Sequence, residues 1–133
     1  MFDAFRAREA AELAPSYTFT RLSIDVYCLQ HPDRYCVSAK SLAAHLTGLA
    51  WVMERGHSEA GLRILQRWLN GRSDLVKPAI PASRGAKTIA DVQGVDREAY
   101  PAAVMGWART TWDAYAPLQV IARAWIEQAT SQA

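Results

Sequence analysis

The chain has 133 residues, of which half are apolar and 21% are charged, and it contains five tryptophans. This composition excludes a disordered or fibrous protein, and the length fits one domain over residues 1–133 with a core of its own. Fifteen Lys and Arg against thirteen Asp and Glu give a formal charge of +2. That surplus is too small to indicate a nucleic acid or an anionic membrane as partner.

The apolar pattern predicts helices from the start of the chain. Residues 3–13 are rich in Ala, Arg and Glu, so we expect an N-terminal helix within residues 1–16 that Pro15 stops. Between residues 18 and 31 the apolar side chains recur on one helical face, at Phe19, Leu22, Val26 and Leu29. Pro32 ends this second segment.

Capping residues locate the next two helices. Ser38 suits the N-cap of a helix that ends near Arg55, where Gly56 supplies a C-terminal signal. Ser58 suits the N-cap of a further helix that continues to Leu69.

Residues 71–87 form a long connection rich in Pro, Gly and basic residues. A structureless segment of this length is uncommon in one domain, so it indicates a lid, a binding loop or an arm on the body. Thr88 and Asp91 then match a capping box, which predicts a short helical turn.

Two more helices are expected, over residues 98–115 and from Pro117 onward. Trp107 and Trp112 are separated by about 140° around a helix, so either that helix is central or one indole lines a groove. An uncovered Trp face would favour a homodimer. No segment alternates as a strand does. We therefore predict an all-α, single-domain bundle of about five helices with one long loop.

The N-terminal residues lack the pattern of a secretory signal, and no apolar run has the length of a membrane span. We therefore expect a cytoplasmic protein that does not enter the membrane. In that compartment Cys28 and Cys36 should be reduced thiols.

Polar side chains are densest between Asp25 and His45. A helix–turn–helix arrangement would make these segments neighbours and could enclose a polar pocket around Asp25, His31 and His45. Asp25 and His31 lie about 240° apart on one helix, so the next helix or the loop would have to unite them. The structural alternative is that His45 is a hydrogen-bonded residue at the core edge and His31 caps helix carbonyls.

This pocket suggests two functions. The first is a binding module for a small polar or anionic molecule, or for a partner protein. Its additional contact residues would be Tyr27, Gln30, Lys40, Ser41, Arg84 and Lys87. The second is an enzyme in which His31 or His45 acts as general acid or base and Asp25 orients the ring.

A metal site is a further hypothesis. Its candidate ligands, which suit zinc or another divalent metal, are Cys28, His31, Cys36 and His45. Their spacing matches none of the strong zinc templates, and a Cys in this setting is most often a packing group. We therefore expect that the protein has no cofactor, and a bound divalent metal is the second hypothesis.

The chain resembles a family of small bacterial proteins known only as a domain of unknown function. The resemblance rests on Asp25-Val26-Tyr27-x2-Gln30-His31-Pro32 and on the later Ser41-x3-His45-Leu46. It covers residues 17–126 and implies a helical domain that shares polar residues as well as apolar ones. Cys28 and Cys36 lie outside this pattern, and the resemblance implies no established activity.

Overall fold

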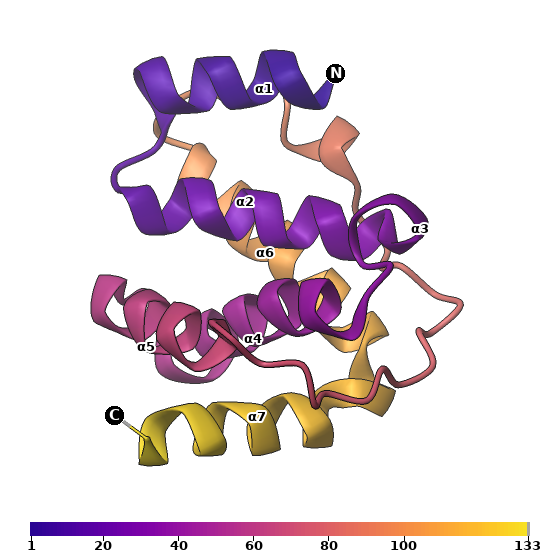
Figure 1. Ribbon diagram of the computed structural model, residues 1–133. Helices are drawn as coiled ribbons and strands as arrows, with labels where there is room; N and C mark the ends of the chain where they lie inside the picture. The colour runs from indigo at the N-terminus through magenta and orange to yellow at the C-terminus, as the bar shows by residue number, and fades with distance from the viewer. Residues whose placement is uncertain (133) are drawn as a thin grey trace.

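The computed structural model describes residues 1–132, and over this range its regular structure is helical (Figure 1). The all-α prediction is confirmed. The elements in chain order are α1 (Phe2–Arg8), the π-helix η1 (Glu9–Leu13), α2 (Tyr17–Gln30), α3 (Pro32–Tyr35), α4 (Ala39–Arg55), α5 (Glu59–Leu69), the 3₁₀ turn η2 (Ile89–Asp91), α6 (Tyr100–Ala114), the 3₁₀ turn η3 (Ala116–Leu118) and α7 (Gln119–Ser131).

Residues 1–132 thus contain seven α-helices, where the sequence suggested about five. Six of the seven correspond to segments in which a helix was expected, and the addition is α3, a single turn at the position expected to be a plain turn. Pro32 is its first residue, and proline suits that position because its φ is already helical and its missing N–H is not needed. The predicted N-terminal helix is also present, but it changes from α1 into a π-helix at Glu9.

The predicted caps are confirmed at three helix starts. The Ser38 hydroxyl accepts from the Ser41 backbone N–H, and Ser58 does the same for Gly61. Thr88 and Asp91 form the expected capping box at η2. These bonds satisfy N–H groups that have no partner inside the helix.

Helix α4 lies at the centre of the fold. It packs against α2, α5, α6 and α7, while α2 also packs against α6. Figure 1 shows α1 covering one side of α2, and α7 lying on the opposite side of the molecule beneath α4 and α5. Because α2 and α5 both pack on α4, the positions of their side chains relative to one another are set through that helix.

The indoles of Trp107 and Trp112 are both buried, so α6 is covered on two sides within one chain. Both indoles are thus covered, as expected for a helix that packs against more than one neighbour. The other three tryptophans are also buried. The tryptophans therefore give no reason to expect a homodimer.

Residues 70–88 contain no helix, and Gln30 fixes the last part of this segment to the body. The Gln30 amide donates to the carbonyls of Arg84 and Lys87 at 2.8 and 2.6 Å, and its oxygen accepts from Trp107 Nε1 at 2.9 Å. Gly85 has φ +103°, and a Cβ there would lie 2.9 Å from the Thr110 carbonyl oxygen. The segment therefore needs glycine where it meets α6.

None of the helices described over residues 1–132 combines the length and apolar character required to cross a bilayer.

Candidate functional site

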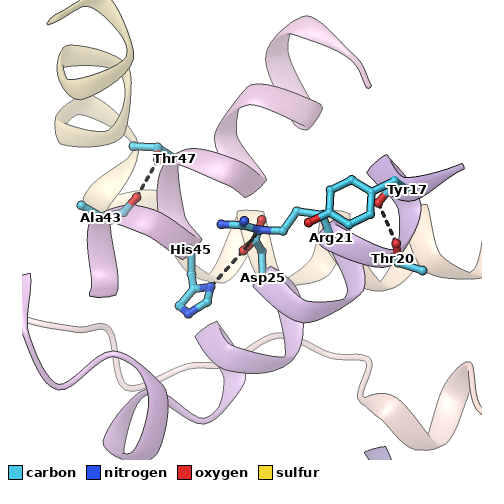
Figure 2. Close-up of polar contacts among 7 residues, drawn as sticks. All are labelled: Tyr17, Thr20, Arg21, Asp25, Ala43, His45 and Thr47. Carbon is cyan, nitrogen blue, oxygen red and sulfur yellow. Dashed lines mark hydrogen bonds and ion pairs between the residues drawn. The ribbon is translucent and has the colours of Figure 1, made fainter. Parts of the chain in front are cut away.

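A buried carboxylate joins α2 to α4. Arg21 Nε donates to Asp25 Oδ1 at 3.1 Å, and His45 Nδ1 lies 2.9 Å from the same oxygen. Figure 2 shows the two side chains converging on Asp25, one from the preceding turn of α2 and the other from α4. The Asp25 side chain is only 1% exposed, whereas that of His45 is 18% exposed. We call Arg21, Asp25 and His45 the Asp25 cluster.

Gly48 makes room for this carboxylate. It lies one turn after His45 on α4, and a Cβ at this position would stand 2.2 Å from Asp25 Oδ2. That oxygen is buried and has no hydrogen-bond partner within residues 1–132. The absence of a side chain at Gly48 therefore lets the carboxylate lie against the α4 backbone, where Oδ1 meets His45.

The environment of His45 favours its protonated form. Burial lowers its pKa, but the hydrogen bond to Asp25, the contact with Cys28 and the charge of Asp25 together raise the pKa to about 9. At neutral pH the imidazole is therefore an imidazolium, and Asp25 lies between two cations. Chemically, the cluster is an oriented positive site rather than a histidine base near neutrality.

His31 lies apart from this cluster. It is exposed, its ring centroid is 4.3 Å from that of Tyr27, and Tyr27 stacks on Phe2 at 3.8 Å. Within the described chain His31 makes neither a hydrogen bond nor an ion pair with Asp25 or His45. Partial burial and the charge of Arg34 lower its pKa. His31 lies apart from Asp25 because six residues of helix turn the two positions about 240° from one another, so the side chains point in different directions.

The four suggested metal ligands are not assembled into a site. Cys36 is buried, its Sγ donates to the Cys28 carbonyl at 3.6 Å, and burial raises its pKa to about 12. Cys28 contacts His45, while His31 lies in the aromatic group around Tyr27. Across residues 1–132 no group of three or more His, Cys, Asp or Glu side chains is placed to hold a metal ion.

The remaining predicted contact residues lie in three other places. Gln30 holds residues 84–87 through their backbone, as described above. Ser41 completes the cap of α4 by accepting from the Ser38 backbone N–H at 3.1 Å. Lys40 is exposed at a smaller hollow of about 200 Å³, beside Arg72. These side chains do not converge on Asp25.

A larger hollow, of about 330 Å³, opens between the first turns of α2 and the outer face of α5. Its lining residues are Tyr17, Arg21, Glu59, Leu62, Arg63 and Gln66. The four from α5 follow the i, i+3, i+4, i+7 spacing of a single helical face. Arg21 belongs both to this hollow and to the Asp25 cluster. The i, i+4 spacing of Arg21 and Asp25 was visible in the sequence and could have identified the pair.

A second buried carboxylate was missed entirely. Glu9 is fully buried, and its Oε2 accepts from Ser23 Oγ and from the Tyr100 hydroxyl, each at 2.5 Å. Its Oε1 has no partner among the described residues, and burial raises its pKa. The available signal was the spacing of Phe5, Glu9 and Leu13, which puts Glu9 in the middle of an apolar face.

These features define a class of protein: an all-helical domain in which a buried carboxylate links two helices by pairing with an arginine and a histidine. The model of a "Family of unknown function (DUF5946)" matches residues 1–116. The chain belongs to this family, which agrees with the resemblance noted in the sequence. No curated protein and no solved structure matches the chain.

Proposed function

We propose that this protein is a binding module for a small anionic molecule, held in the hollow between α2 and α5. The observation that carries the proposal is the double role of Arg21, which lines the hollow and is fixed by the buried Asp25 carboxylate. A guanidinium with one N–H committed to a carboxylate retains further donors for a ligand oxygen. Its fixed orientation reduces the entropy lost on binding.

Charge supports this choice. The Asp25 carboxylate is faced by Arg21 and by a His45 whose pKa is raised to about 9, so the cluster carries a net positive charge at neutral pH. Arg63 adds a second guanidinium to the hollow, opposed by the single carboxylate of Glu59. An anionic group would therefore be attracted to the Arg21 side of the hollow.

This proposal keeps two residues of the predicted polar pocket, Asp25 and His45, as groups that position Arg21. It assigns no ligand contact to His31, which lies on the aromatic group around Tyr27. The raised pKa of His45 argues against this histidine as a general base, because a general base works best with a pKa close to the working pH.

The test is calorimetric titration with inorganic phosphate and with acetate, at constant ionic strength in a chloride background. We expect Arg63→Gln to weaken binding about tenfold, the usual effect of losing one charge-assisted hydrogen bond. Arg63 is exposed and has no ion pair within residues 1–132, so the fold should survive.

The matched control is Arg67→Gln. Arg67 lies one turn further along α5, is also exposed and does not line this hollow. Its loss should change the affinity less than twofold. Absence of binding by both anions, or an equal loss in the two variants, would contradict the proposal.

A further inference from the structure

The charged groups of the hollow come in both signs, and this restricts the ligand further. Glu59 and Arg63 are four residues apart on α5 and line the same hollow. Residues at this spacing commonly pair with one another, yet neither takes part in an ion pair among residues 1–132. Each therefore has its charge available to a bound molecule.

Arg21, the other cation of the hollow, differs from Arg63 because its guanidinium is already held by a carboxylate. Arg21 is held by Asp25 at 3.1 Å and is only partly exposed, whereas Glu59 and Arg63 are exposed. Two guanidinium groups, one fixed and one adjustable, can share a carboxylate. The carboxylate of Glu59 then remains for a positively charged group of the same molecule.

From this arrangement we propose that the ligand of the hollow is a free α-amino acid. Its carboxylate would bind Arg21 and Arg63, and its ammonium group would bind Glu59. Side chains one helical turn apart have Cβ atoms about 5–6 Å apart, which suits the two neighbouring charges of such a molecule. This inference rests on the proposed function, since it names the class of anion that the hollow takes.

The size and the remaining walls of the hollow agree with this ligand. A volume of about 330 Å³ lies at the lower end of the range for small-molecule sites, about 300–1,000 Å³. Leu62 and the ring of Tyr17, which is 61% exposed, offer an apolar surface to a side chain. Figure 2 shows the Tyr17 ring beside Arg21, so the apolar surface adjoins the expected carboxylate position.

The position of α5 relative to α2 is held from outside the hollow. The Phe19 ring on α2 stacks on His57, just before α5, with centroids 4.1 Å apart. Gly61 on α5 allows close contact with Trp51 of α4, because a Cβ at Gly61 would stand 2.4 Å from that indole. The two sides of the hollow are therefore placed before any ligand arrives.

Calorimetric titration can separate the two charges of the ligand. The probes are L-leucine, its deaminated analogue 4-methylpentanoate and its decarboxylated analogue 3-methylbutylamine. We expect L-leucine to bind at least fivefold more tightly than either analogue. Glu59→Gln should abolish the advantage of L-leucine over 4-methylpentanoate, and Arg63→Gln should weaken L-leucine and 4-methylpentanoate alike.

Glu59 also lies in the first turn of α5, where a carboxylate stabilises the helix dipole. That structural role would change the melting temperature of Glu59→Gln but not its preference between L-leucine and 4-methylpentanoate. The control is Glu127→Gln, an exposed glutamate of α7 outside the hollow, which should leave that preference unchanged.

Equal affinity for L-leucine and 4-methylpentanoate, unaffected by Glu59→Gln, would overturn the amino-acid assignment and leave the anion-binding proposal intact. Binding of phosphate or acetate without binding of L-leucine would have the same meaning. Failure of every anion to bind would overturn both proposals.

Discussion

Two carboxyl side chains, those of Asp25 and Glu9, are buried in the fold, and they have different polar neighbours. Asp25, between α2 and α4, meets the cationic side chains of Arg21 and His45. Glu9, between η1, α2 and α6, accepts hydrogen bonds from the hydroxyl groups of Ser23 and Tyr100. The charge of Arg6 acts on it as well, but Glu9 forms no ion pair among residues 1–132. Burial disfavours a charge unless an opposite charge lies nearby. Burial therefore raises the pKa of Glu9, whereas at the other site the carboxylate raises the pKa of His45.

The two buried carboxylates therefore differ in the groups to which they connect. The Asp25 carboxylate is part of a charged set that reaches the surface hollow through Arg21. The Glu9 carboxyl group accepts hydrogen bonds from Ser23 and Tyr100, and none of these three residues lines the hollow between α2 and α5. An ion pair with a side chain that also lines a hollow, and not the depth of burial, distinguishes the candidate ligand site from the structural one.

The largest loss of stability is expected on removal of Asp25, the buried carboxylate that has cationic partners. Asp25→Ala leaves Arg21 and His45 partly buried without their carboxylate, and breaking such a pair costs about 3–5 kcal/mol. Urea unfolding at pH 7 measures this loss. Asp113→Ala, at an exposed position of α6, is the control and should change stability by less than about 0.5 kcal/mol. A loss below about 1 kcal/mol for Asp25→Ala would contradict the assigned pairing.

The second effect is a pH dependence that belongs to His45. Its folded pKa, about 9, lies above the ordinary value of 6.5. Its stabilisation is therefore fully present below pH 6.5 and is lost as the pH rises from 6.5 through 9, by about 3 kcal/mol. Comparison of urea unfolding of the wild type and His45→Gln between pH 6 and pH 9.5 isolates this contribution.

His31→Gln is the control for this measurement. The pKa of His31 is lowered, so any contribution from His31 is lost as the pH falls and has the opposite sign. NMR titration of the His45 ring gives a direct check. A midpoint near 6.5 for His45 would show that the interactions with Asp25 and Cys28 only offset the effect of burial, and it would contradict this pH dependence.

The smallest effect on stability is expected at Glu9, the buried carboxyl group that forms no ion pair among residues 1–132. Because burial raises the pKa of Glu9, its favourable contribution is present below the ordinary value of 4.5 and is lost as the pH rises through the folded pKa. Glu9→Gln keeps an acceptor for Ser23 and Tyr100 without a charge. Between pH 5 and pH 8 the wild type should lose about 1 kcal/mol of stability that Glu9→Gln does not lose, as measured by urea unfolding.

Glu12→Gln provides the comparison within the same π-helix. Glu12 is exposed and pairs with Arg8, so its substitution should leave the pH dependence close to that of the wild type. If Glu9→Gln instead became steadily less stable than the wild type toward pH 8, the Glu9 carboxyl group would be ionised in the fold and its charge would be stabilised by its neighbours.

Local signals in the sequence predicted the helices well. The caps at Ser38, Ser58 and Thr88 were identified because each contact lies within three residues of its cap. The π-helix at Glu9 had no such signal. The single turn α3 was expected as a plain turn, since Pro32 can both end one helix and begin another.

The site was predicted only in part. Asp25 and His45 were placed together because both lie in polar stretches of neighbouring helices, and the structure pairs them. His31 was added because it is close in sequence, but as the C-cap residue of α2, four residues after Tyr27, it lies against the Tyr27 ring. The hollow was missed because its two sides, on α2 and α5, are about forty residues apart and are related only through α4.

By itself, then, the amino-acid order determined the helical class, most of the helix starts and the apolar faces, since these depend on contacts within one or two turns. Only the tertiary structure decided which polar groups meet, Asp25 with His45 beside Gly48 and Glu9 with Tyr100, and that Arg21 lines one hollow with the α5 face. The physical reason is that such contacts depend on the rotation and register of packed helices. Those quantities are fixed by the whole core at once and by no single segment.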